Sequence, residues 1–175
     1  MNRRELIRLL GRHGVVQFGE FKLSSGGFSD YYIDMRRAIS VPAIYREIIE
    51  LMTGEAVGVE LIAGIESGGV PWASMLAYRM GMGMIYVRKQ VKEHGTARLV
   101  EGIYEPGQRV LVVDDVVTTG SSIRKGVESL KSVGLDVVKA LAIVDRSGGA
   151  ADAGAELRSV FSVGELLDEL KDAHQ

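Results

Sequence analysis

The apolar positions in the middle of the chain follow two alternating patterns. Some segments are short and almost continuously apolar, as expected of strands buried on both faces of a parallel sheet: residues 61–65, 84–88, 110–114 and 137–144. Other segments repeat apolar residues at helical spacing: residues 42–57, 70–80 and 123–133. This order of strand, helix, strand, helix and strand predicts an α/β fold with a central, mostly parallel sheet and helices on both faces.

The two ends of the chain add shorter elements. Helix-like and strand-like segments occur there at residues 2–13, 18–23, 31–36, 157–163 and 165–173. No linker or internal repeat divides the chain. We therefore expect a single domain over residues 1–175, in which residues 1–37 and 150–175 form a small cap over the sheet.

Composition and net charge limit which kinds of functional site and binding partner the chain can have. The chain has 175 residues, a formal net charge of −2 and no cysteine, so disulfides, thiolate metal sites and cysteine nucleophiles are excluded. This charge gives no indication of nucleic-acid or membrane binding. The basic N-terminus has the spacing of an amphipathic helix and lacks the long apolar core of a secretory signal. We expect a soluble cytoplasmic protein with no nucleic-acid partner and no membrane partner.

The stretch VLVVDDVVTTGSS, residues 110–122, is the most informative part of the sequence. Asp114 and Asp115 follow an apolar run, at the end of a strand where open α/β sheets place ligands. The hydroxyl-rich turn at residues 118–122, here called the phosphate loop, leads into a predicted helix. A helix N-terminus offers unpaired N–H groups to a phosphate. The pattern therefore indicates a ligand with both hydroxyls and a phosphate, such as a phosphorylated ribose.

This stretch resembles the phosphoribosyl-diphosphate-binding motif of the type I phosphoribosyltransferases, in which an acid pair precedes a T-x-G-[ST] turn. The resemblance implies the type I phosphoribosyltransferase fold. It assigns the binding of phosphoribosyl diphosphate to Asp114, Asp115, Val116, Val117, Thr118, Thr119, Gly120, Ser121 and Ser122. The alternative is an acid pair that only caps a turn between strand and helix.

A second group of charges lies in YVRKQVKEHG, residues 86–95, here called the basic segment. By itself, such a stretch is typical of a solvated loop. Beside a phosphate site, its cations would stabilise the negative charge that develops on a departing diphosphate.

The basic segment resembles the catalytic loop of the orotate phosphoribosyltransferases, R-K-x-x-K-x-H-G. The same family shows segments like FGEFKLSSGGFSDYYID at residues 18–34 and VDRSGG at residues 144–149. The resemblance covers most of the chain and implies transfer of phosphoribosyl from phosphoribosyl diphosphate to orotate, with release of diphosphate, in pyrimidine biosynthesis. It also implies a homodimer, in which the loop of residues 88–101 completes the site of the neighbouring subunit.

The resemblance assigns roles to individual residues. The catalytic residues are Lys92, His94, Asp114 and Asp115, and Arg88 and Lys89 bind the diphosphate charge. Mg²⁺ is implied as the cofactor. Because Mg²⁺ usually binds through substrate phosphates with few protein carboxylates, we expect no direct protein ligand. Asp114 and Asp115 would instead hold ribose hydroxyls, directly or through metal-bound water.

Orotate is a planar anion, and a carboxylate is best held by the fork of an arginine. Arg146 matches the orotate-binding arginine of the family, Tyr32 would stack on the ring, and Thr118 would touch both ring and ribose. An exposed turn arginine and an ordinary strand tyrosine are the alternatives for Arg146 and Tyr32.

The glycine loop, GIESGGVP at residues 64–71, resembles the diphosphate loop of the family, although ordinary turn chemistry would also explain a glycine pair after a strand. Two positions depart from the family pattern. Ser24 and Gly68 stand where many relatives carry lysine. Lys22 would lie on the same strand face as position 24 and is expected to bind phosphoribosyl diphosphate in its place.

Two other functions share the acid-pair motif. One is a purine-type phosphoribosyltransferase, against which the basic segment argues. The other is a regulator that senses phosphoribosyl diphosphate, a class that would not need Lys92 and His94 and would typically carry a nucleic-acid surface.

Overall fold

The computed structural model describes residues 1–23, 26–90 and 98–172. The chain forms two compact units, one of Ile48–Val163 and one of Met1–Glu47 with Gly164–Gln175. Each unit has its own secondary structure, and the larger one contains the central sheet.

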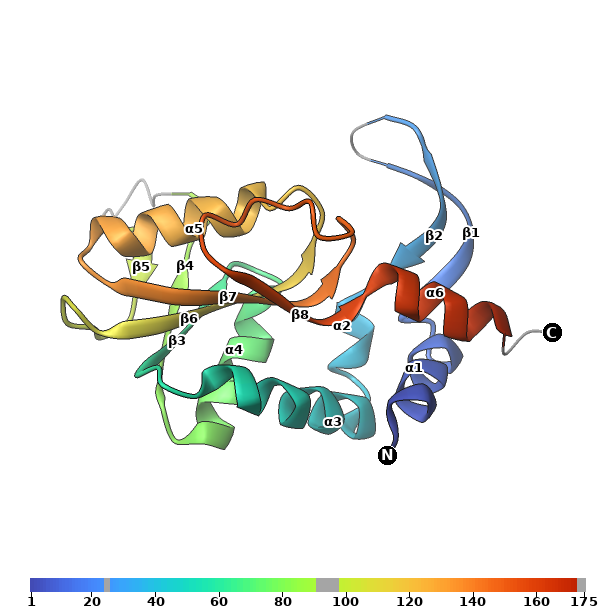
Figure 1. The fold of residues 1–175 in the computed structure, drawn as a ribbon, viewed down its shortest axis with the longest axis horizontal. Coiled ribbons are helices and arrows are strands. Elements are labelled where there is room, and N and C mark those ends of the chain that lie inside the picture. The colour runs from blue at the N-terminus through green and yellow to red at the C-terminus, as the bar shows by residue number, and fades with distance from the viewer. Residues whose placement is uncertain (24–25, 91–97, 173–175) are drawn as a thin grey trace. The chain divides into compact units, whose positions relative to one another are not determined.

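The larger unit is built on a six-stranded sheet with the order β5-β4-β3-β6-β7-β8 (Figure 1). Its strands are β3 (Leu61–Ile65), β4 (Gly83–Val87), β5 (Val100–Glu101), β6 (Arg109–Val117), β7 (Asp136–Asp145) and β8 (Leu157–Ser162). All neighbouring pairs are parallel except β4 and β5. The prediction of an α/β fold with a mostly parallel sheet is confirmed.

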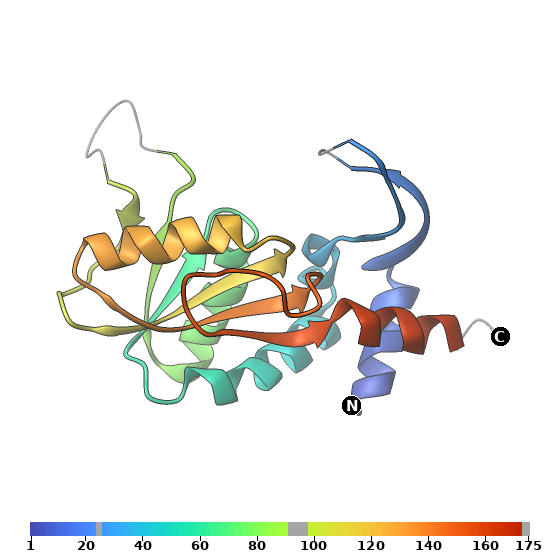
Figure 2. The same ribbon diagram turned by 45° about the horizontal axis from the view of Figure 1, so that its top comes forward.

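Helices α4 (Gly69–Met80) and α5 (Ser121–Ser132) lie on opposite faces of this sheet (Figures 1 and 2). Small residues allow both helices to approach closely. A Cβ at Gly64 of β3 would lie 2.9 Å from Cα of Val70 and 3.0 Å from Cβ of Ala73 in α4. A Cβ at Gly126 of α5 would overlap the side chain of Ile65. The prediction of helices on both faces is therefore confirmed.

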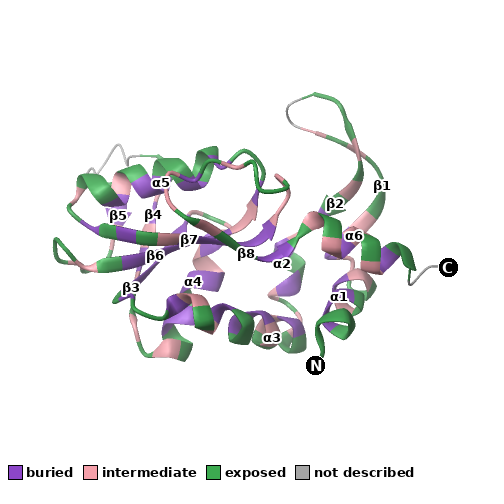
Figure 3. Cartoon of the chain, in the orientation of Figure 1, coloured by how far each residue is buried: buried purple, intermediate pink, exposed green. Residues whose placement is uncertain are grey.

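The apolar runs form the core, as their pattern requires. Val110, Leu111, Val112 and Val113 are all fully buried. Figure 3 shows buried residues along the central strands and on the sides of the helices that face them. Burying a side chain of this size contributes about 1.5–3 kcal/mol, so these runs hold the sheet together.

The smaller unit contains α1 (Arg3–Arg12), the antiparallel hairpin of β1 (Val16–Lys22) and β2 (Phe28–Ile33), α2 (Met35–Ala38) and most of α6 (Val163–Asp172). Asn2 caps α1 in a capping box with Glu5. Arg8 donates to Glu169 at 2.8 Å, which joins α1 to α6. The chain passes from the smaller unit to the larger one within helix α3 (Pro42–Met52), and the 3₁₀ turn η1 (Thr53–Ala56) belongs to the larger unit.

The bounds of three expected elements differ by three residues or more at one end or both. The strand expected at residues 31–36 ends at Ile33, because the Asp34 side chain accepts a hydrogen bond from Arg36 N and caps α2. The helix expected at residues 42–57 becomes a 3₁₀ turn after Met52. The central strand β6 continues three residues beyond Asp114, to Val117.

Part of the predicted cap belongs to the central sheet. Residues 157–162 of the expected C-terminal segment pair with β7 as strand β8, and the smaller unit resumes at Gly164. That the terminal segments cover the sheet stays a prediction. None of the helices in the described ranges has the length and apolar character needed to cross a bilayer.

Candidate functional site

The acid pair lies within β6, near its carboxyl end. Asp114 is only 7% exposed, and Asp115 is half-buried. Asp115 N donates to Asp114 Oδ1 at 2.9 Å, and Val116 N donates to Asp115 Oδ1 at 2.8 Å. Backbone hydrogen bonds therefore orient both carboxylates while leaving each of them lone pairs for a ligand.

Burial changes the acidity of the first carboxyl group. Removal from water, followed by the negative charge of Asp115, raises the pKa of Asp114 to about 7. The N–H group of Asp115 and the positive charge of Lys89 oppose this rise. A ligand that brings positive charge or hydroxyl donors to the site would favour the ionised form of Asp114.

The phosphate loop follows β6 and opens α5. Gly120 is the N-cap of α5 with a left-handed φ of 87°, and a Cβ there would overlap the backbone of Asp152. Thr118, Thr119, Ser121 and Ser122 are exposed. Exposed hydroxyls and the unpaired N–H groups of the first helical turn can together hold a phosphate.

The glycine loop lies directly beside the acid pair. A Cβ at Gly68 would overlap the Asp115 carboxylate, and a Cβ at Gly69 would overlap the Val113 carbonyl oxygen. The loop includes a cis peptide bond between Glu66 and Ser67. Because Asp115 fills the space beside Gly68, a side chain at position 68 requires the carboxylate to move.

Arg88, near the start of the basic segment, contacts Leu99 and Glu101 beyond its end. Arg88 N donates to Leu99 O at 2.8 Å, so the chain enters and leaves this region at adjacent points. The Arg88 guanidinium lies 3.8 Å from the Glu101 carboxylate, and its Nε atom is buried without a hydrogen-bond partner in the described part of the chain. Lys92 and His94, both predicted to be catalytic, lie outside the described residues, as does Ser24.

A pocket connects the basic segment with the phosphate loop. It has a volume of about 670 Å³, and its lining includes Arg88, Lys89, Ser122 and Lys125. The structure therefore brings together cations from the end of β4 and a hydroxyl from the start of α5. The cations and the hydroxyl suit an anion with several oxygens, whereas Glu128, which also lines the pocket, does not.

Arg146 lies at the same edge of the sheet. It follows β7, and its N–H donates to Val117 O, the last residue of β6, at 2.8 Å. The side chain is half-buried. The structure thus places Arg146 next to the strand that carries the acid pair, as parallel strands with adjacent carboxyl ends require.

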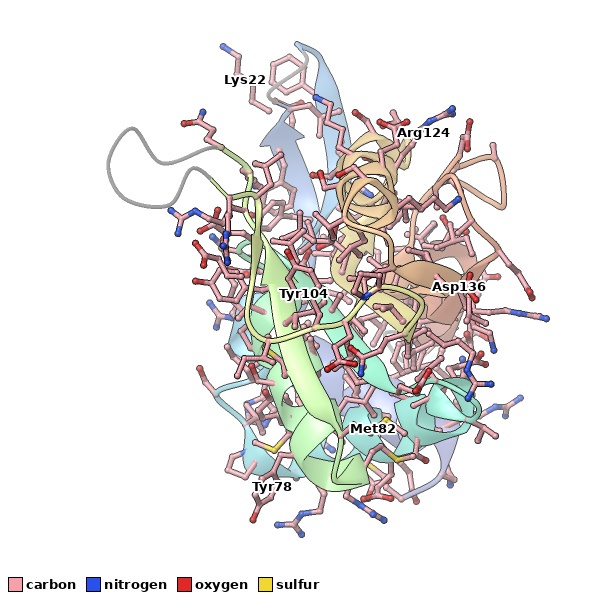
Figure 4. The ribbon with its side chains drawn as sticks, turned by 90° about the vertical axis from the view of Figure 1, so that its left-hand side faces the viewer. Lys22, Tyr78, Met82, Tyr104, Arg124 and Asp136 are labelled. Carbon is pink, nitrogen blue, oxygen red and sulfur yellow. The ribbon has the colours of Figure 1, made fainter. Side chains whose placement is uncertain are left out.

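Lys22 and Tyr32 belong to the hairpin of the smaller unit. Lys22 is exposed near the hairpin tip, and Figure 4 labels it there. The Tyr32 ring is 37% exposed and stacks on Phe21 at 5.5 Å between ring centroids, and its hydroxyl accepts from Arg36 at 3.3 Å. Their roles toward phosphoribosyl diphosphate and orotate stay predictions.

Sequence reasoning missed several residues that shape this site. Glu66 of the glycine loop accepts a hydrogen bond from Lys89 N at 2.9 Å. Ser147 and Asp152 organise the loop after β7. Strand β5 was missed because it is two residues long. The position of Glu66 immediately after a buried strand was the one signal that could have identified it.

Comparisons with known proteins agree with this geometry. The phosphoribosyl transferase domain family matches residues 30–168. An orotate phosphoribosyltransferase of Pyrobaculum islandicum is 42% identical over 166 residues, which are 91% of this chain and 86% of the relative.

Two crystal structures have the same fold over nearly the whole chain. The orotate phosphoribosyltransferase of Aeropyrum pernix has a TM-score of 0.86 and 41% identity, with 95% of this chain and 98% of that chain covered. That of Mycobacterium tuberculosis H37Rv, in complex with 5-phospho-α-D-ribosyl 1-diphosphate, has a TM-score of 0.74 and 35% identity, with 94% and 98% covered. With its acid pair, phosphate loop and glycine loop gathered at one edge of the sheet, the chain belongs to the orotate phosphoribosyltransferase family.

Proposed function

We propose that the protein transfers the 5-phosphoribosyl group from phosphoribosyl diphosphate to orotate, giving orotidine 5′-monophosphate and diphosphate. The observation that carries the proposal is the convergence of the phosphate loop, Asp114, Asp115 and Arg146 at the carboxyl edge of one sheet. The relatives named above are orotate phosphoribosyltransferases.

Each group of residues has a part in the transfer. The phosphate loop holds the 5′-phosphate, and the acid pair accepts hydrogen bonds from the ribose hydroxyls. The glycine loop, Arg88 and Lys89 face the diphosphate. Its charge rises as the bond to the anomeric carbon breaks, so cations placed there stabilise the transition state more than the ground state. Arg146 holds the orotate carboxylate, and Thr118 lies where ribose and base meet.

Lys92 and His94 complete the machinery as the residues that assist diphosphate departure. Their part in the proposal rests on the sequence R-K-x-x-K-x-H-G. The proposed roles of Lys22 toward phosphoribosyl diphosphate and of Tyr32 toward the orotate ring rest on the resemblance of residues 18–34 to the family. The expected location in the cytoplasm stays a prediction.

Mg²⁺ is the proposed cofactor. Among residues 1–23, 26–90 and 98–172, no three His, Cys, Asp or Glu side chains gather in a way that could hold a metal ion. The two oxygen-donor carboxylates of Asp114 and Asp115 fit an ion that binds mainly through substrate oxygens. They would hold it through bound water, and the ion, when bound, neutralises diphosphate charge.

The direct test is an assay of the purified protein with phosphoribosyl diphosphate and Mg²⁺ against a panel of orotate, hypoxanthine, adenine and uracil. We expect loss of orotate absorbance and no turnover of the purines. Turnover of a purine in place of orotate would identify a purine-type enzyme. Binding of phosphoribosyl diphosphate with no turnover of any base would favour the regulator.

We also propose a homodimer in which residues 88–101 complete the neighbouring site. Lys92→Ala and Asp115→Ala chains, co-expressed with different tags, would form mixed dimers with one site that lacks both changes. Random pairing predicts about a quarter of the wild-type activity from two inactive chains. A mixture as inactive as its parents would show that each site uses its own basic segment.

A further inference from the structure

The loop after β7, residues 145–156, is folded around one serine hydroxyl. Ser147 Oγ donates to Asp145 Oδ1 at 2.6 Å and accepts from Gly149 N at 3.1 Å and Ala151 N at 3.0 Å. One donor and two acceptor sites are the full capacity of a hydroxyl group. The hydroxyl is thus the centre of the loop rather than a solvated surface group.

Asp145 fixes the first half of the loop. Its Oδ1 atom accepts from both Ser147 N, at 2.7 Å, and Ser147 Oγ. Gly148 and Gly149 then adopt left-handed φ values of 65° and 88°, which side chains with a Cβ rarely adopt. The hydrogen bonds of Asp145 and Ser147 form a clasp over residues 145–151. Arg146 lies between Asp145 and Ser147, so its backbone is held from both sides.

The second half of the loop is fastened to the phosphate loop. Asp152 N donates to Thr119 O at 3.1 Å, and the Asp152 carboxylate pairs with Arg124. Arg124 lies near the start of α5 and is labelled in Figure 4. The backbone of Asp152 also fills the space above Gly120. The loop that carries Arg146 is therefore seated on the segment expected to hold the 5′-phosphate.

We propose that Ser147 is a positioning residue for orotate, whose hydroxyl holds the clasp of residues 145–151 so that Arg146 meets the carboxylate of the base. This inference rests on the proposed function. An arginine holds a carboxylate in a fork only over a narrow range of orientations, so a loosened backbone weakens this contact first. Contacts to the ribose and diphosphate are expected from β6, the phosphate loop, the glycine loop and the basic segment, whereas the hydrogen bonds of the Ser147 hydroxyl go to Asp145, Gly149 and Ala151.

The test is steady-state kinetics of Ser147→Ala, with the KM values for orotate and for phosphoribosyl diphosphate measured separately. Loss of a hydroxyl that organises a charged contact predicts an orotate KM about tenfold higher, with kcat and the other KM within about twofold of wild type. Ser147→Thr keeps the hydroxyl and should restore the orotate KM. Ser159→Ala, an exposed serine of β8, is the matched control.

Several outcomes overturn the inference. One is an unchanged orotate KM in Ser147→Ala, and another is an equal rise of both KM values, which indicates general loosening. Failure of threonine to restore the orotate KM is a third.

If Ser147→Ala does not fold, Asp145→Asn tests the same clasp, because the amide oxygen still accepts but carries no charge. It should raise the orotate KM about threefold without changing the other KM, and equal changes in both would contradict the proposal. Wild-type protein that turns over no orotate would instead overturn the proposed function itself.

Discussion

The carboxyl ends of β6 and β4 are both expected to contact phosphoribosyl diphosphate, but they are built in opposite ways. At the end of β6, the acid pair lies inside the strand, with one carboxyl group buried and both oriented by backbone N–H groups. At the end of β4, the strand stops before the first cation, and Arg88 and Lys89 follow it, with Arg88 N donating to Leu99 O. Groups expected to hold the ribose lie within a buried strand, whereas the cations expected to meet the leaving diphosphate lie beyond the end of their strand.

The largest effect is expected at the basic segment. Lys92→Ala should lower kcat by about 10- to 1000-fold, because a cation that meets the departing diphosphate acts mainly in the transition state. The KM for orotate should change little. Steady-state assays with both substrates measure this, and Lys171→Ala, an exposed lysine of α6, is the control. Unchanged turnover would show that Lys92 takes no part in the chemistry. The proposed difference in role between the ends of β6 and β4 would then be wrong.

A smaller effect is expected at the end of β7. Arg146→Ala should raise the orotate KM by about 10- to 100-fold, since a carboxylate loses its paired, charge-assisted hydrogen bonds. Arg158→Ala is the matched control, because Arg158 is exposed on β8 and pairs with its neighbour Glu156. Equal effects of the two substitutions would show that Arg146 is an ordinary surface arginine.

The close contact between the glycine loop and β6 predicts a loss of stability. In Gly69→Ala, the added Cβ would overlap the Val113 carbonyl and lie 3.0 Å from Asp114 Cα, so backbone must shift. Overpacking of this kind should lower the free energy of unfolding by about 1–3 kcal/mol.

Urea denaturation measures this change. Gly164→Ala, where a Cβ would meet nothing within 4 Å, is the control and should be neutral or stabilising. If the two alanine variants were equally stable, the glycine loop would not be fixed against the acid pair.

The smallest effect concerns the pH dependence of the acid pair. With its pKa raised to about 7 in the folded state, Asp114 binds more protons folded than unfolded between its ordinary pKa and 7. Its contribution to stability is therefore full at low pH and is lost as the pH rises through about 7. Asp114→Asn removes this dependence.

We expect wild-type protein to lose about 1–2 kcal/mol relative to Asp114→Asn between about pH 6 and pH 8, measured by urea unfolding. Parallel pH profiles for the two proteins would indicate that the Asp114 carboxyl group is solvated. The acid pair would then not differ from the basic segment in burial.

Some features of the fold and of the site could be predicted from the sequence, and others could not. Consecutive apolar residues define β3 at residues 61–65 with its observed bounds, and the hydroxyls at residues 118–122 mark the start of α5. These features depend on neighbours in the chain. The clasp around Ser147 and the hydrogen bond from Lys89 to Glu66 depend on backbone groups made adjacent by the turn or the sheet, and no sequence period reports them.

Element ends and very short elements, where the hydrophobic pattern is weak, were also harder to predict. Arg36 was expected in a strand because Tyr31, Tyr32 and Ile33 continue toward it, but the side chain of Asp34 begins a helix instead. A two-residue strand such as β5 has no period, and it exists only because β4 offers it a partner. In the first case a local hydrogen bond overrides the residue pattern, and in the second the strand forms through pairing with β4.

The hydrogen bond between Glu66 and Lys89 has a mechanical consequence. Glu66 N donates to Val87 O, and its carboxylate accepts from Lys89 N, so one residue bridges the exits of two neighbouring strands. Glu66 of the glycine loop is therefore held to the end of β4 and to the start of the basic segment by two hydrogen bonds. Separating these two parts of the expected diphosphate site requires both of these hydrogen bonds to break.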